Sequence, residues 1–265
     1  MLNEVDVILQ GGIWDCTYKA ALQYSKLDFV KSIIISTSVA DKDAANLQET
    51  FLSKIKVVAH DEPAYEGGGN MNYQIVSTKR GLEEVTARNV VKIRSDQIIT
   101  NESMERMHRF YKKFWIPYND VECDGPIFVI GQMSNYPYHP QDHIFWGTTA
   151  DINRLFTLPD CNWPTYVPPV DFTKILRVPI HLGGHYYKRF DKRVQHHLDN
   201  PYAYLVDQAP RFQEAMNLSD TLRDKVFKCF PRIDLYWDKY RDTHKNYPYP
   251  FYHSQGEYCY EGNWE

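Results

Sequence analysis

Short apolar runs alternate with amphipathic segments along the first part of the chain. Apolar runs of strand length occupy residues 5–10, 30–37, 55–60 and 89–95. Segments with helical spacing lie between them, at 17–24, 44–52 and 72–85. Strands that alternate with helices are typical of a parallel sheet covered on both faces. The unbroken apolar run at Ile33 to Ile35 indicates a strand buried inside that sheet. The pattern therefore predicts an α/β fold with a mostly parallel central sheet.

The pattern loosens after residue 100. Helices are predicted at 103–114 and 149–156, and strand-like runs at 127–131 and 144–147. Residues 190–245 have helical spacing with many charges, and 247–264 form an aromatic-rich tail. The chain contains no repeat and no low-complexity linker. We therefore predict a single domain over 1–265 with a C-terminal helical and aromatic-rich extension.

The composition narrows the class of protein. Of 265 residues, 43% are hydrophobic and 24% charged, which excludes disordered and fibrous proteins. A formal net charge of -4 offers no general attraction to nucleic acid. Five scattered cysteines without a CxxC pair favour a reducing compartment. No run approaches the ~18 apolar residues of a membrane span, and the first apolar run is too short for a signal peptide. We expect a cytoplasmic protein, at most peripherally attached to a membrane.

Ligands of an open α/β sheet bind outside the carboxyl ends of its strands. This rule selects four segments for inspection, residues 10–12, 36–38, 60–62 and 94–96. The first segment lacks GxGxxG spacing, and the chain has no GxxxxGK[ST] loop, so an NAD oxidoreductase and a P-loop NTPase lose their usual support. Gly11 and Gly12 would let the backbone approach a ligand, or would simply form a tight turn.

The fourth predicted strand carries charges at alternate positions. Lys92, Arg94 and Asp96 share one face, and Asp96 stands where the strand ends. A carboxylate there suits a divalent cation that bridges a diphosphate, and the two cationic side chains would stabilise a departing diphosphate. Taken alone, these residues first indicate a surface ion pair at a strand end.

Five segments carry a family resemblance: VILQGGIWD at 7–15, IIISTSVAD at 33–41, NMNYQIVSTKRGLEEV at 70–85, VVKIRSDQ at 90–97 and DHIFWGTTADINRLF at 142–156. Their order and spacing resemble the WavE lipopolysaccharide synthesis family of glycosyltransferases, over roughly residues 5–160. The resemblance implies a GT-A-type fold in which a nucleotide-sugar donor lies across the first four strand ends. Residues 1–100 would then be the nucleotide-binding half, 101–190 the acceptor and catalytic half, and 191–265 the helical C-terminal extension.

The resemblance also implies roles for individual residues at the donor site. The residues expected around the nucleotide are Gln10, Gly11, Thr37, Asn70, Gln74 and Ser95, with Lys92 and Arg94 as electrostatic support. Gly67 to Gly69 would let the chain come close, and the helix that follows would present free N–H groups to an anion. Arg94-Ser95-Asp96 stands where related enzymes have D-x-D, so Asp96 carries over as the ligand of the metal or diphosphate. Mn or Mg is the expected cofactor, and a UDP-sugar or GDP-sugar the favoured donor.

An inverting transfer also needs a general base within hydrogen-bond reach of the acceptor hydroxyl. Asp142 is the candidate, because it follows a Pro-bounded loop and occupies the place where the family pattern has an acid; His143 is the reserve. Alternatively, Asp142 accepts backbone N–H groups in a turn. Trp146, with Tyr136 or Tyr138, is a candidate for stacking on the acceptor sugar, although core packing explains these aromatics as well.

A further metal ligand is suggested by the i, i+4 spacing of His181 and His185, of which His181 is the candidate. Gly183 and Gly184 weaken the prediction of a helix there. Together these patterns predict a metal-assisted, inverting glycosyltransferase that acts on a glycan or glycolipid acceptor. A retaining enzyme of the same fold remains open, as does a catalytically silent carbohydrate- or nucleotide-binding protein, because the first acid of D-x-D is missing.

Overall fold

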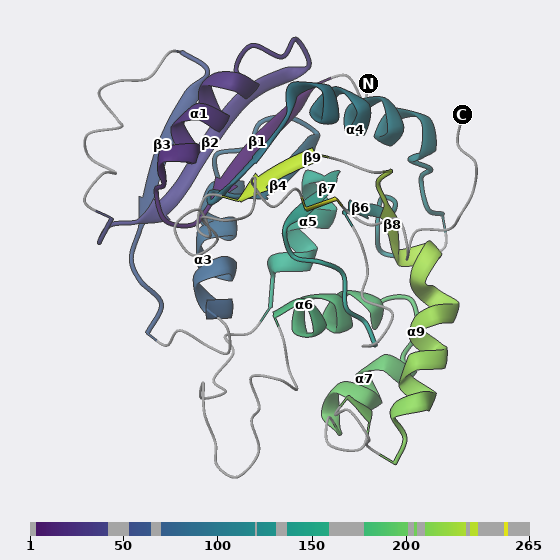
Figure 1. Ribbon diagram of the computed structural model, residues 1–265. Coiled ribbons are helices and arrows are strands. Elements are labelled where there is room, and N and C mark those ends of the chain that lie inside the picture. Colours follow the sequence, from purple (N-terminus) through teal and green to yellow (C-terminus); the bar gives the residue numbers. More distant parts are fainter. Residues whose placement is uncertain are drawn as a thin grey trace.

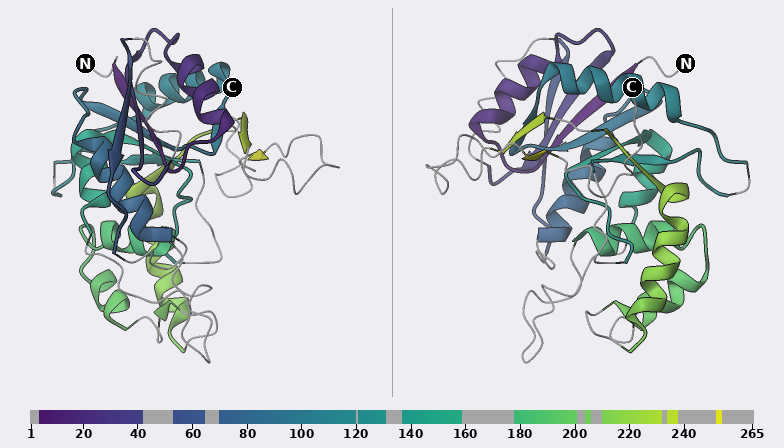
Figure 2. Two further views of the ribbon diagram at one scale, coloured as in Figure 1. Left: turned by 90° about the vertical axis from the view of Figure 1, so that its left-hand side faces the viewer. Right: turned by 45° about the vertical axis from the view of Figure 1, so that its right-hand side comes forward.

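The computed structural model describes residues 4–41, 53–64, 70–119, 121–130, 137–158, 178–200, 204–205, 210–231, 234–237 and 252–253. A seven-stranded sheet crosses the molecule, with helices on both faces (Figures 1 and 2). This arrangement confirms the predicted α/β class and the mostly parallel sheet. None of the described helices combines the length and the apolar character that a membrane span requires.

Four parallel strands form one half of the sheet, in the order β3-β2-β1-β4. They are β1 (Val5–Gln10), β2 (Val30–Ser38), β3 (Ile55–His60) and β4 (Asn89–Arg94). β2 lies between β1 and β3, and its Ile33, Ile34 and Ile35 are buried, as the unbroken apolar run predicted. The helix predicted at 44–52 lies outside the described residues.

The other half of the sheet contains one strand that runs in the opposite direction. β7 (Ile144–Thr148) pairs antiparallel with both β4 and β6 (Ile127–Val129), and β8 (Phe227–Cys229) pairs parallel with β6. β8 belongs to the segment 190–245, for which an all-helical structure was predicted, and that prediction was wrong here. A three-residue strand is too short to interrupt a helical pattern visibly.

Alternate side chains of the sheet enter two separate cores. The helices on one face are α1 (Asp15–Tyr24) and α4 (Asn101–Phe114), and those on the other are α3 (Met71–Leu82) and α5 (Thr149–Phe156). Val7 and Val91 pack in the first core, whereas Ile8 and Val90 pack in the second. Because strand side chains alternate between faces, both cores depend on the same register.

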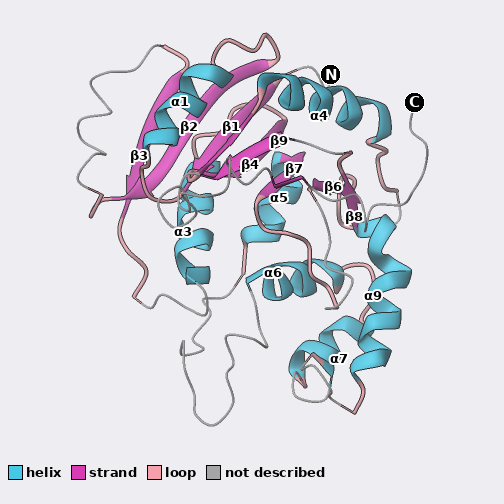
Figure 3. Cartoon of the chain, viewed as in Figure 1, coloured by secondary structure: helices cyan, strands magenta, loops and turns pink. Residues whose placement is uncertain are grey.

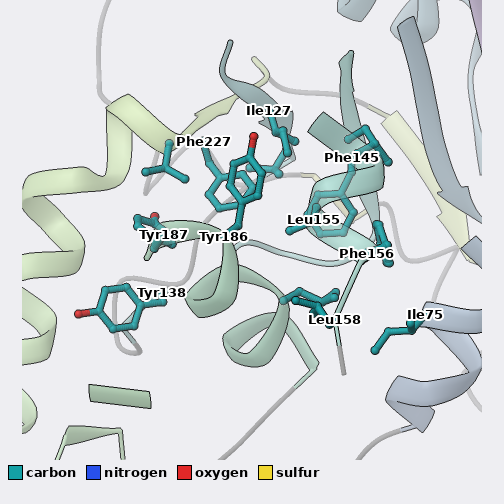
Figure 4. Packing of buried hydrophobic residues seen from close by; sticks show 14 of the residues in the cluster. Ile75, Ile127, Tyr138, Phe145, Leu155, Phe156, Leu158, Tyr186, Tyr187 and Phe227 are labelled. Atoms are coloured by element: carbon teal, nitrogen blue, oxygen red, sulfur yellow. The ribbon is translucent and has the colours of Figure 1, made fainter. Parts of the chain in front are cut away.

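Three further helices lie below the sheet in the view of Figure 3, and their apolar side chains extend the second core. They are α6 (Val178–Tyr187), α7 (Arg193–Asp199) and α9 (Phe212–Val226). α6 is helical despite its two glycines, and a Cβ on Gly183 would lie only 2.1 Å from the Tyr138 carbonyl oxygen. Glycine thus lets α6 pack directly on the backbone. Tyr186 and Tyr187 of α6 pack with Phe227 in an aromatic core (Figure 4).

The aromatic residues suggested as an acceptor platform belong to these cores. Trp146 is completely buried and stacks on Tyr111, with ring centroids 5.6 Å apart. Tyr138 is also completely buried, and Tyr136 lies outside the described residues. The alternative explanation, core packing, therefore holds for Trp146 and Tyr138.

A small antiparallel sheet lies beside the end of β4. Its strands are β5 (Gln97–Ile99), β9 (Asp234–Trp237) and β10 (Tyr252–His253), with β9 in the middle. β5 starts only two residues after β4 ends. Ser95 and Asp96 are therefore held in a tight turn between strands of two different sheets.

Candidate active site

The carboxyl ends of β1, β2, β3 and β4 open into one cavity of about 390 Å³. It brings together most of the predicted donor-site residues: Gln10, Gly11, Thr37, Asn70, Gln74, Arg94, Ser95 and Asp96. Trp14, Asp41, His60 and Tyr73 also line it, and the sequence interpretation gave them no role. Each had a signal, because His60 ends a predicted strand and the other three lie in segments that carry the family resemblance. The cavity lies where the strand-end rule places a ligand.

Gly11 joins the ends of β1 and β4. Its φ of +124° is a backbone conformation that residues other than glycine rarely adopt. A Cβ at this position would lie 2.7 Å from Ser95 Oγ. The Ser95 N–H donates to the Gln10 carbonyl at 2.9 Å, and the Ser95 hydroxyl donates to the Gly12 carbonyl at 2.6 Å. Gly11 is thus required for a close backbone contact at the cavity wall.

Arg94 and Asp96 form a two-pronged ion pair in the cavity wall. Arg94 Nε donates to Asp96 Oδ1 at 3.0 Å, and Arg94 Nη2 donates to Asp96 Oδ2 at 2.7 Å. The Asp96 side chain is 6% exposed and that of Arg94 23%, so the pair is not the surface ion pair considered from the sequence. Bidentate pairing fixes both side chains in one orientation.

Asp142 precedes β7 and contacts the cavity through Gln74. Gln74 Nε2 donates to Asp142 Oδ2 at 2.8 Å, and Arg94 Nη1 lies 3.9 Å from the same oxygen. Burial raises the pKa of Asp142, but the positive charges of its neighbours and the Gln74 hydrogen bond outweigh burial and hold it at about 2. Asp142 is therefore a carboxylate at neutral pH. It does not itself line the cavity.

Lys92 lies behind Asp142 rather than in the cavity. Its side chain is completely buried, and Nζ donates to the Asp142 carbonyl oxygen at 2.8 Å. Nζ also lies 5.6 Å and 5.9 Å from the ring centroids of Phe145 and Phe156. Burial lowers the pKa of Lys92 from 10.5 to about 7, with Asp142 opposing that shift. His143 is half-buried, and loss of solvation lowers its pKa from 6.5 to about 4.

Three buried polar atoms of cavity-lining residues have no hydrogen-bond partner among the described residues. They are Gln10 Oε1, His60 Nε2 and Gln74 Oε1. A buried polar atom without a partner costs ~1–3 kcal/mol, so such atoms are normally satisfied. All three belong to residues of the cavity wall, so a ligand bound there would lie close to unpaired polar groups.

The N-terminus of α3 also faces this region. Asn70, which lines the cavity, adopts a left-handed conformation with φ of 62°, and its side chain makes no capping hydrogen bond. The first N–H groups of a helix carry positive partial charge and attract anions. The glycines predicted to precede this helix, Gly67 to Gly69, lie outside the described residues.

The described residues contain no group of three His, Cys, Asp or Glu side chains that could hold a metal ion. His181 lies in α6, as predicted, but its side chain is outside what the structure describes. Asp96 does fit a cation that the ligand helps to bind. Asp96 lines the cavity as a carboxylate, and Mg²⁺ often binds one or two carboxylates together with substrate phosphates.

No protein-family model and no curated protein matches the sequence. Among solved structures, S. aureus TarS aligns with 69% of this chain and 33% of its own, at 12% identity and a TM-score of 0.43. HddC from Yersinia pseudotuberculosis aligns with 72% of this chain and 99% of its own, at 14% identity and 0.36. 4-Diphosphocytidyl-2C-methyl-D-erythritol synthase from Anaerococcus prevotii aligns with 58% of this chain and 74% of its own, at 11% identity and a TM-score of 0.36. The chain thus spans about a third of the length of TarS.

Proposed function

We propose that the chain is a glycosyltransferase that binds a nucleotide-sugar donor in the strand-end cavity and transfers the sugar to a glycan or glycolipid acceptor. The observation that carries this proposal is the convergence of four parallel strand ends on one cavity, whose walls hold buried polar atoms without a partner among the described residues. Its volume of about 390 Å³ lies within the ~300–1,000 Å³ common for ligand pockets. Membership of the WavE family and a cytoplasmic location remain predictions.

In this proposal Arg94 contacts the donor diphosphate, with Asp96 holding the guanidinium in place. Asp41 and Asp96 also line the cavity, so its described wall carries more negative than positive charge. A diphosphate therefore needs further positive charge, which the N-terminus of α3 and a Mn or Mg ion on Asp96 would supply. When bound, that ion would neutralise charge that builds up on the departing diphosphate.

Asp142 is the proposed general base for the acceptor hydroxyl. It is ionised at neutral pH, and Gln74 and Lys92 fix its position next to the cavity. A base on the acceptor side is the reason to propose inversion. The pKa of Asp142, about 2, makes this carboxylate a weak base, since general bases work best with a pKa near the working pH. We therefore expect Asp142 to contribute through position more than through basicity.

Titration calorimetry with UDP-, GDP-, CMP- and dTDP-sugars, each with Mn or with EDTA, tests the proposal. We expect one nucleotide class to bind, more tightly with Mn, and to be hydrolysed slowly without acceptor. Asp96→Ala should abolish the Mn effect and the hydrolysis, whereas Asp28→Ala, a change at an exposed aspartate, should alter neither. Failure of every nucleotide-sugar to bind the folded protein would contradict the proposal.

The low basicity of Asp142 favours one alternative from another class, a catalytically silent nucleotide- or carbohydrate-binding protein. For such a protein, Asp96→Ala would leave ligand affinity nearly unchanged, and no donor would be turned over. A measurable loss of donor hydrolysis in Asp96→Ala would exclude it.

A further inference from the structure

The cavity has two chemically different ends. Among the lining residues that the structure describes, Arg94 is the only lysine or arginine, and it lies at the end of β4. The opposite end is formed by β3, whose last residue, His60, lines the cavity. Three strand spacings separate the ends of β3 and β4, about 14 Å at ~4.8 Å per spacing. A nucleoside diphosphate with its phosphates at Arg94 would therefore place its base toward β3.

His60 has a defined tautomer at that end. Its Nδ1 lies 2.8 Å from the Asp61 carbonyl oxygen. A carbonyl oxygen can only accept, so Nδ1 carries the hydrogen, and in the neutral ring Nε2 is then a hydrogen-bond acceptor. The residue is only 8% exposed, and Nε2 has no partner among the described residues.

The hydroxyl groups next to His60 are already engaged. Ser38 pairs with His60 in the sheet, and its hydroxyl donates to Glu62 Oε1 at 3.2 Å. The Thr37 hydroxyl donates to Asp41 Oδ2 at 3.2 Å. Among the described residues, His60 Nε2 is a buried acceptor at this end that has no donor.

We propose that His60 selects the nucleobase of the donor by accepting a hydrogen bond from a ring N–H at Nε2. This inference rests on the proposed function. Uracil and guanine carry such a ring N–H, whereas the corresponding ring nitrogens of cytosine and adenine have no hydrogen. The site thus discriminates by the hydrogen-bonding pattern of the base, and the wrong base leaves a buried acceptor unpaired.

Nucleotide analogues test this inference directly. Affinities of the full chain for UDP and N3-methyl-UDP are measured by calorimetry, and GDP and N1-methyl-GDP are used if GDP binds better. We expect methylation to weaken binding about tenfold or more. In His60→Ala the ratio of the dissociation constants of the methylated and unmethylated nucleotides should fall to near one, because the acceptor is gone. His60→Gln, which offers an amide oxygen, is the second variant if His60→Ala does not fold, and should keep part of the preference. Ser38→Ala, at the same end of the cavity, is the matched control and should keep the full ratio.

The outcomes separate the two proposals. If UDP or GDP binds but methylation has no effect, or if His60→Ala retains the full ratio, the role of His60 is wrong and the proposed function stands. If neither diphosphate binds but a CMP-sugar does, the role of His60 is wrong and the proposed function stands. If no nucleotide-sugar binds the folded wild-type protein, the proposed function fails, and the role of His60 fails with it.

Discussion

Replacing Lys92 by methionine tests the buried charge behind the cavity. Burial lowers the Lys92 pKa from 10.5 to about 7, while Asp142 opposes the shift. Between about pH 7 and about pH 10 the unfolded chain therefore binds more protons than the folded one, so this group makes the protein more stable as the pH rises through that window. Its cost is present in full below about pH 7.

The magnitude follows from the two pKa values. Their difference, from 10.5 to about 7, corresponds to a full cost of about 5 kcal/mol at ~1.4 kcal/mol per pH unit. About 2 kcal/mol of that cost disappears between about pH 7 and about pH 9. Removing the amine also leaves the Asp142 carbonyl without its donor, at a cost of ~1–3 kcal/mol that does not depend on pH.

The assay is urea unfolding of both proteins over this pH range, with the two free energies of unfolding subtracted at each pH. The pH-dependent contributions of ionisable groups that titrate alike in both proteins then cancel. We expect the wild type to gain about 2 kcal/mol relative to Lys92→Met from about pH 7 to about pH 9. Lys31→Met, at an exposed position of β2, is the control and should give a constant difference. A constant difference for Lys92→Met would refute the reasoning. Lys92→Gln, which keeps an N–H donor, serves if the methionine variant does not fold.

Four further changes have expected outcomes. Gly11→Ala should lower the free energy of unfolding by about 1–3 kcal/mol and weaken nucleotide binding, because of its positive φ and the contact with Ser95. Gly12→Ala, whose Cβ would meet nothing closer than 3.7 Å, should leave unfolding in urea nearly unchanged. Asp151→Asn should cost about 3 kcal/mol in the same assay, since the buried carboxylate accepts from the Gly125 N–H and the Thr148 hydroxyl. Gln74→Leu removes a hydrogen bond to the Asp142 carboxylate, so an NMR titration should find the Asp142 pKa above its wild-type value; an unchanged or lower pKa would contradict the contact.

The strand ends that line the cavity were predictable because their signals are local. Each is a short apolar run followed by glycine, serine or an acid, and parallel strands bring such ends to one edge of a sheet. The contact between Gln74 and Asp142 joins residues 68 positions apart. It depends on β7 pairing antiparallel with β4, which no local pattern specifies. The sequence therefore proposed both residues but not their hydrogen bond.

The burial of Asp96 and its pairing with Arg94 were not predictable for a related reason. Alternation along β4 correctly placed them on one face, but their environment depends on β7 and on the turn into β5. Likewise, His60 was noticed as a strand end, yet its role follows from a tautomer set by the Asp61 carbonyl. Such details arise from packing between distant segments and not from any periodicity in the residues themselves.

The pairing of β8 with β6 has a consequence for how the chain is made. Phe227 pairs with Ile127, about a hundred residues earlier in the sequence. The ribosome adds ~5–20 residues per second, so roughly 5–20 seconds would pass between the synthesis of β6 and that of β8. During that time its unpaired edge resembles the strand edges that promote aggregation. Synthesis that stops before Phe227 should therefore yield a product that depends on chaperones.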